Sequence, residues 1–187
     1  MNYILDTNVL INMKRAFPFS KGNDFFWEFV ASLARSGFFK IPESVIDELI
    51  DKSKDKKDKQ KEDLLGDWIK THKEDIKLST KKVLENGSLN DVLSSYNSIR
   101  GVRLTESELE ILNKKADPYV IAHALTEKAC LITDEIKGGI SIHTNINNVQ
   151  IPNICDIHSV SYRTGMFFIW ELSQKYAEFC RQQASEV

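Results

Sequence analysis

Four acidic residues stand where their carboxylates could act together. Asp6 and Asp134 each follow a short apolar run directly, Asp117 precedes a proline, and Glu48 lies in the segment after another apolar run. Ligands of an open parallel sheet bind beyond the carboxyl ends of its strands, so these segments can bring the four acids to one edge. Carboxylates that lie close together repel each other, and such a cluster takes up a proton or a cation.

The chemistry open to such a cluster is metal-assisted hydrolysis. Carboxylate oxygens suit Mg²⁺ or Mn²⁺, which keep several water ligands and also bind phosphate oxygens. A metal held in this way lowers the pKa of bound water and neutralises charge that builds on phosphorus oxygens. The residue types therefore indicate hydrolysis of a phosphodiester bond.

Each acid also has a purely structural interpretation. Asp6 can cap the helix that follows it, and Asp117 before a proline is a common helix N-cap. Glu48 alone is an ordinary solvent-facing helix residue, and Asp134 alone is an ordinary turn residue at a strand end. Spacing by itself leaves both interpretations open.

Short apolar runs and amphipathic helices form the scaffold that these acids need. Four runs are too short for helices and predict strands, at residues 3–5, 38–41, 129–133 and 149–151. Helices are expected between and after these strands. The first is capped by Thr7 or Asn8, the second starts after Asn23-Asp24 and stops at Gly37, and two later ones open with capping boxes at Ser44/Asp47 and Thr105/Glu108. Another starts at Asp117-Pro118, and the last covers about 164–183. Strands separated by helices predict an α/β fold with a central parallel sheet and helices on both faces.

A length of 187 residues predicts a single domain over residues 1–187. The charge-rich segment at about 51–104 is expected to be a helical insertion between the second and third predicted strands. Within it, "DKSKDKKDKQKED" holds six lysines and five acids. This balance predicts a solvated mixed-charge segment rather than a basic patch for nucleic acid.

Composition excludes several classes of protein. Apolar residues make up 42% of the chain, charged residues 28%, and the net charge is −2, which is typical of a soluble globular protein. The sequence has neither an apolar run long enough for a transmembrane helix nor a basic leader, so we expect a cytoplasmic protein that makes no membrane contact. Cys130, Cys155 and Cys180 are widely spaced, which predicts free thiols rather than a zinc site.

Four motifs together resemble a PIN domain, the nuclease fold of many toxins in toxin-antitoxin pairs. They are "YILDTNVLI", "IPESVIDELI", "KADPYVIAHAL" and "LITDE", and they carry Asp6, Glu48, Asp117 and Asp134 in the family's order. The resemblance runs from Met1 to about Pro152. The long interval between Glu48 and Asp117 resembles a larger PIN-like subgroup.

This resemblance implies a three-layer α/β/α sandwich and metal-dependent cleavage of RNA by water, without a covalent enzyme intermediate. It implies that Asp6, Glu48, Asp117 and Asp134 hold one or two Mg²⁺ or Mn²⁺ ions, and that Thr7 or Asn8 and Thr133 support them by hydrogen bonds. Two neighbouring acids compete for these roles, because Glu43 can replace Glu48 and Glu135 can replace or assist Asp134.

The expected partners are an RNA substrate, an antitoxin protein and a second copy of the chain. The last helix carries more aromatic residues than one core-facing stripe needs, which suits a protein contact. The alternative is a PIN-like binding or scaffold protein with little or no catalysis, because no basic groove is evident in the sequence. Basic residues that could line one are Lys14, Arg15, Arg100, Arg103, Lys137 and Arg163. A minor option is a phosphatase that uses Asp6 as phosphate acceptor.

Overall fold

One five-stranded parallel sheet forms the centre of the computed structural model, which describes residues 3–19, 24–54 and 64–185. The strand order is β3-β2-β1-β4-β5, and every neighbouring pair is parallel. The strands are β1 (Tyr3–Leu5), β2 (Phe39–Pro42), β3 (Lys77–Leu78), β4 (Cys130–Ile132) and β5 (Tyr162–Arg163). The predicted α/β class with a central parallel sheet is confirmed.

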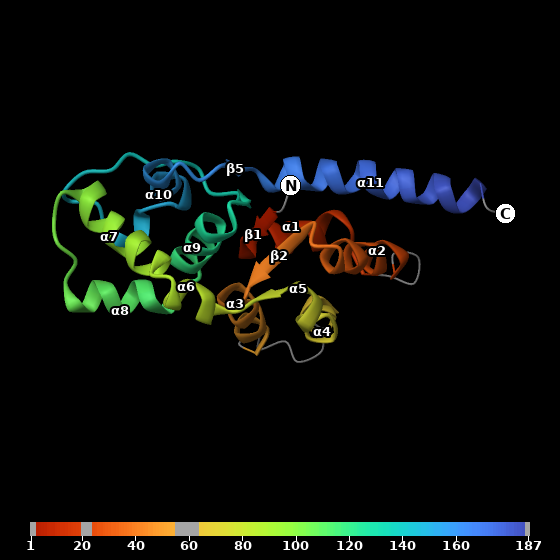
Figure 1. The fold of residues 1–187 in the computed structure, drawn as a ribbon, viewed down its shortest axis with the longest axis horizontal. Coiled ribbons are helices and arrows are strands. Elements are labelled where there is room, and N and C mark those ends of the chain that lie inside the picture. The colour runs from red at the N-terminus through yellow and green to blue at the C-terminus, as the bar shows by residue number, and fades with distance from the viewer. Residues whose placement is uncertain (1–2, 20–23, 55–63, 186–187) are drawn as a thin grey trace.

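Helices cover both faces of this sheet (Figure 1), as the three-layer prediction requires. On one side, α9 packs against β1, β2 and β4, and α6, α7 and α10 pack against α9. On the other side α11 packs on α1 and α2. The α-helices of the described residues are α1 (Thr7–Ala16), α2 (Asp24–Arg35), α3 (Glu43–Lys54), α4 (Leu64–Thr71), α5 (Lys73–Ile76), α6 (Thr80–Glu85), α7 (Ser88–Arg100), α8 (Glu106–Lys114), α9 (Asp117–Glu127), α10 (Ile151–His158) and α11 (Gly165–Ser185).

An aromatic contact fixes α11 to the sheet. Phe168 is fully buried, and its ring centroid lies 5.4 Å from that of Tyr3 and 5.7 Å from that of Phe39, both edge-to-face. Edge-to-face rings combine large apolar burial with a favourable quadrupole interaction. The Tyr3 hydroxyl also donates to Glu171 Oε2 at 2.7 Å, so one residue of the central strand holds α11 through both its ring and its hydroxyl.

Some of the expected helix ends are confirmed and others are wrong. Thr105 and Glu108 form the predicted capping box, and Gly37 takes the left-handed conformation just after α2. Ser44 forms no cap, because α3 begins one residue earlier, at Glu43. The first helix is capped by Asp6 rather than by Thr7 or Asn8.

The strand predicted at 149–151 is also wrong. A 3₁₀ turn occupies Ile146–Asn148, and α10 begins at Ile151 with Pro152 in its first turn. Proline suits this position because the first turn of a helix leaves its N–H groups unpaired. The strands β3 and β5 were not predicted, since strands of two residues show no alternation of apolar and polar side chains.

The segment at about 51–104 contributes to the sheet as well as adding helices. Its β3 pairs in parallel with β2, with Ile41 opposite Lys77 and Pro42 opposite Leu78. Of the charged run, residues 55–63 lie outside the described residues. The rest of the segment contains α4 to α7.

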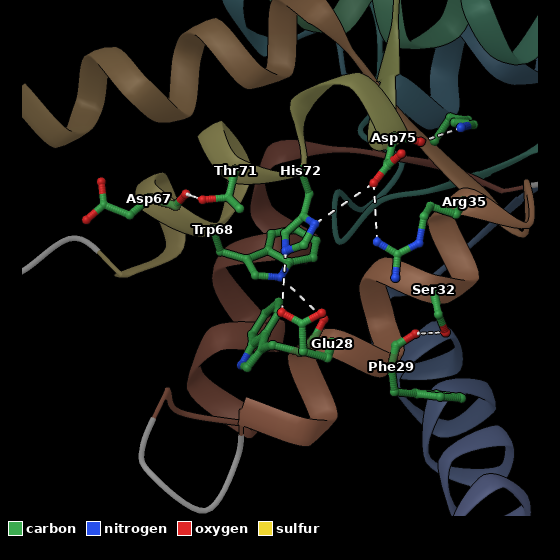
Figure 2. Close-up of polar contacts among 11 residues, drawn as sticks. Glu28, Phe29, Ser32, Arg35, Asp67, Trp68, Thr71, His72 and Asp75 are labelled. Atoms are coloured by element: carbon green, nitrogen blue, oxygen red, sulfur yellow. Dashed lines mark hydrogen bonds and ion pairs between the residues drawn. The ribbon is translucent and has the colours of Figure 1, made fainter.

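Polar contacts attach α4 and α5 to α2, as Figure 2 shows. His72 is almost buried; its Nε2 lies 3.8 Å from Glu28 Oε1 and its Nδ1 lies 4.0 Å from Asp75 Oδ2. Asp75 Oδ2 also lies 3.4 Å from Arg35 Nη1. The His72 ring packs against Trp68, with the ring centroids 5.1 Å apart. These contacts hold the segment in place just before β3.

The three cysteines are free thiols, as predicted; Cys130 and Cys155 are buried and Cys180 is exposed. Within the described part of the chain, no helix is both long enough and apolar enough to cross a membrane.

We expect Phe168→Ala to lower the free energy of unfolding by about 3–5 kcal/mol, because it leaves a cavity between α11 and β1. Urea unfolding followed by circular dichroism measures this change. The matched control is Trp170→Ala on the same helix, where the side chain is 57% exposed and the change should stay within about 0.5 kcal/mol. Equal losses in the two variants would show that α11 does not pack on the sheet through Phe168.

Candidate functional site

Asp6 lies at the carboxyl end of the central strand and is only 3% exposed. Its Oδ1 accepts from the Thr7 backbone N–H at 2.7 Å, and its Oδ2 accepts from Thr133 Oγ1 at 3.0 Å. Thr133 follows β4, which pairs with β1, so the parallel register brings the two residues together. Both carboxylate oxygens of a buried acid are therefore hydrogen-bonded.

The charge of Asp6 is nevertheless unfavourable in this position. Burial, and after it the nearby negative charges of Asp117 and Glu135, raise its pKa from 3.8 to about 7 against the opposing hydrogen bonds from Thr7 and Thr133. Three carboxylates from three segments thus interact through space at the end of β1. A bound cation would relieve this repulsion.

Glu48 is joined to the same place through a hydroxyl group. Thr7 Oγ1 donates to Glu48 Oε2 at 2.6 Å, while the Thr7 backbone donates to Asp6. The competing acid, Glu43, instead accepts from the backbone N–H of Thr80 at 3.3 Å, at the start of α6. The structure therefore links Glu48 with Asp6 and places Glu43 in a helix contact.

Asp134 and Glu135 face different neighbours. Asp134 accepts from Asn12 Nδ2 at 2.6 Å and from the Gly165 backbone N–H at 2.8 Å, so each of its two oxygens is engaged beside α1 and α11. Glu135 accepts from the Ile151 backbone N–H at 2.6 Å, at the start of α10.

The charge of Glu135 reaches the Asp6 cluster. Burial raises the pKa of Glu135 and the charge of Asp117 adds to this, whereas the Ile151 hydrogen bond and Lys115 lower it. Of Asp134 and Glu135, it is therefore Glu135 whose charge interacts with both Asp6 and Asp117. Asn8, the remaining predicted supporting residue, is exposed on α1.

Sequence reasoning missed four residues at this edge. Asn12 and Gly165 hold Asp134, Lys115 acts on Glu135, and Tyr96 is buried near the acids. Burial and the charges of Asp117 and Glu135 raise the Tyr96 pKa. Asn12 carried a usable signal, because it is polar within the apolar helix that follows Asp6.

Several of the basic residues proposed for a groove have other contacts. Arg100 is largely buried and its Nη1 lies 2.7 Å from Glu108 Oε1. Lys137 pairs with Asp156. Arg15 Nη1 donates to Asn12 Oδ1 at 3.0 Å, next to the Asp134 contact.

The donor set suits a hard divalent cation in its chemistry. Carboxylate oxygens of Asp6, Glu48, Asp117 and Glu135 are the ligands that Mg²⁺ and Mn²⁺ prefer. Among the described residues no three acidic, histidine or cysteine side chains are already arranged to hold a metal. Mg²⁺ commonly binds through one or two carboxylates and keeps its other water ligands, so the set fits without a complete protein cage.

The fold and the site define an α/β protein with a parallel sheet and an acidic cluster beyond the carboxyl ends of its central strands. The chain belongs to the family described as a domain of unknown function (DUF4411), whose model matches residues 3–176. No curated protein is found to match the chain in sequence.

One similar solved structure is described as the crystal structure of VapBC2 from Rickettsia felis bound to a DNA fragment from their promoter. It shares 17% sequence identity with this chain, with a TM-score of 0.46, and the match covers 88% of this chain and 98% of that one. A likeness this distant does not transfer a function.

We expect Asp6→Asn to stabilise the metal-free protein at pH 8 but not at pH 3.5. Because the Asp6 pKa is raised to about 7, the folded protein keeps a proton that the unfolded chain releases above about pH 4, and stability falls as pH rises through this window. Asparagine cannot ionise, so the variant does not show this loss of stability. The difference between the folded and unfolded pKa values of Asp6 limits the loss to about 4 kcal/mol. Urea unfolding of both proteins in EDTA across pH 3.5–8 measures it. A variant no more stable than the parent at pH 8 would contradict the raised pKa.

We expect Gly165→Ala to destabilise the protein by about 1–3 kcal/mol through overpacking. A Cβ atom at this position would lie 2.8 and 2.9 Å from the two carboxylate oxygens of Asp134, forcing that side chain away from Asn12. Gly139→Ala is the control, because no atom lies within 4 Å of its added Cβ. Thermal unfolding compares the two. Helix propensity alone would make Gly165→Ala more stable, so a gain in stability would contradict the steric argument.

Proposed function

We propose that the chain is a PIN-like, metal-dependent endoribonuclease that hydrolyses RNA phosphodiester bonds, and that it is the toxin of a toxin-antitoxin pair. The observation that carries this proposal is the buried Asp6 carboxylate, on which the charges of Asp117 and Glu135 act. A protein without a cation to bind gains nothing evident from this repulsion. The motifs that resemble a PIN domain contain all three of these residues, as well as Glu48 and Asp134.

Asp6, Glu48 and Asp117 would hold Mg²⁺ or Mn²⁺, with Glu135 or Asp134 as the fourth acid. When bound, the metal would supply an activated water and offset negative charge on the phosphate. Thr7 and Thr133 hold the Asp6 oxygens in one orientation, and Thr7 does the same for Glu48. Fixed carboxylates reduce the reorganisation needed when charge develops on the substrate.

The partners that this function implies are RNA and an antitoxin protein, in the cytoplasm. For a protein partner or a homodimer the last helix is the candidate surface. Phe168 belongs to the core, whereas Trp170 and Met166 are 57% and 72% exposed on the first turns of α11. These two exposed side chains support a protein contact at this end of the helix.

The test is cleavage of end-labelled single-stranded and structured RNAs with Mn²⁺ or Mg²⁺. We expect cutting that EDTA abolishes and that Asp6→Asn and Asp117→Asn each reduce by at least about 100-fold, as expected for loss of charge stabilisation at a reacting phosphate. Asp67→Asn is the control, because Asp67 is an exposed carboxylate on α4 that pairs with Lys70. It should cleave like the parent protein.

The alternative is a binding or scaffold protein. It is favoured by the lack of a preformed set of three metal ligands among the described residues. A folded protein that cuts no RNA, and whose melting temperature does not rise with Mn²⁺, would support this alternative, because a ligand that binds only the native state must stabilise it. Cleavage that survives in both aspartate variants would reject the proposed site.

A further inference from the structure

A cleft of about 430 Å³ opens directly beside Glu48. Its walls come from α3, the start of α6, the end of α8 and the start of α9. The lining is polar, with both charges present: Ser44, Asp47, Glu48, Asp51, Thr80, Asn113, Lys114, Lys115 and Tyr119. Its volume is within the range of small-ligand sites, so it can accept a group of nucleotide size.

The α8 wall of this cleft is held rigidly. Thr105 and Glu108 form a capping box at the start of α8, and Glu108 Oε1 lies 2.7 Å from Nη1 of the largely buried Arg100 on α7. The helix ends at Lys114, and Lys115 continues in an extended conformation toward Asp117. Lys115 therefore lies between α8, whose first turn these contacts fix, and the start of α9.

Lys115 places a positive charge near the acids of the candidate site. It lines the cleft together with Glu48, and its charge lowers the pKa of Glu135. Among the described residues no carboxylate forms a close ion pair with it, in contrast to Arg100 and Lys137, which each have one. A half-buried ammonium group beside an acidic cluster is suited to an anionic substrate that also reaches that cluster.

The rest of the lining suits a base better than a second phosphate. Tyr119 contributes an aromatic ring, held by its hydroxyl donating to the Asn113 carbonyl at 3.2 Å. Asn113 and Thr80 contribute hydrogen-bonding side chains. Ser44 Oγ is buried and has no hydrogen-bond partner among the described residues. Aromatic rings stack on unpaired bases, and amide and hydroxyl groups bind base edges.

We infer that this cleft binds one nucleotide of single-stranded RNA beside the phosphate to be cleaved, with Lys115 contacting the backbone and Tyr119 the base. The inference rests on the proposed function and adds the substrate class and the residues that recognise it. A base in a duplex is stacked and paired, so it cannot enter the cleft without unpairing. An acidic peptide fits less well, because its side chains offer no base to stack on the Tyr119 ring.

The first test measures binding without catalysis. Fluorescence anisotropy in EDTA gives the Kd of the full-length protein for a labelled single-stranded RNA, at several salt concentrations. We expect Lys115→Ala to weaken binding by about 5- to 10-fold and to reduce the slope of log Kd against log salt by about 0.7, as for one lost phosphate contact. Tyr119→Leu should weaken binding by about tenfold, in the range of one lost stacking contact.

Two controls separate recognition from folding. Lys70→Ala removes an exposed lysine on α4, outside the cleft, and should leave both Kd and the salt slope unchanged. Lys115→Arg keeps the charge and should restore binding. The same sequence as a duplex should bind more than about tenfold more weakly, by the cost of extruding a base.

The second test is the kinetics of cleavage with Mn²⁺. Lys115→Ala should raise KM and leave kcat within about twofold, as for a contact that binds substrate and transition state equally. Asp6→Asn should lose kcat yet keep the Kd measured in EDTA. RNA binding that Lys115→Ala leaves unchanged, equal binding of duplex, or no RNA binding at all overturns the inference. If RNA binding depends on Lys115 but the protein cuts no RNA, the result supports RNA binding in the cleft and rejects the proposed nuclease activity.

Discussion

The structure depends on keeping one carboxylate buried at the end of its central strand. Asp6 directly follows β1, which lies between β2 and β4 in the sheet, and the residue is only 3% exposed. Thr7 and Thr133 supply two hydrogen bonds, which favour the ionised form, yet burial and neighbouring charges act more strongly against it. The large apolar core around β1 must offset this local cost, a pattern common at functional sites.

The geometry of strand ends explains how the neighbouring acids divide their roles. Asp134 and Glu135 are consecutive residues just beyond β4, where the Glu135 backbone N–H donates to Thr133 Oγ1 at 3.2 Å and the two side chains contact different elements. One reaches Asn12 and the start of α11, and the other reaches α10 and the Asp6 cluster. Two adjacent residues thus have different roles: Asp134 joins α1 to the start of α11, and Glu135 acts on the charge of Asp6.

The sequence could predict what depends on short-range pattern. Short strands separated by helices are enough to predict the parallel sheet, whereas the supporting role of Thr133 beside Asp6 was implied only by the resemblance to a PIN domain. The sequence could not predict contacts set by packing over long separations, such as Asn12 with Asp134 or Lys115 with Glu135. The strand expected at 149–151 failed for a related reason, because an apolar run beside a proline suits the first turn of a helix equally well.

The long interval between Glu48 and Asp117 changes the shape of the edge where the acids lie. Pairing of β3 with β2 fixes the chain just before Thr80, and α8, which opens with a capping box, ends at Lys114 directly before Lys115. Thr80 and Lys115 both line the cleft that Glu48 lines. Without these inserted elements, α3 would lack this opposite wall. In the nuclease proposed above, the extra helices would form the surface that the RNA contacts beside Glu48, which ties the length of the interval to recognition rather than to the acidic cluster itself.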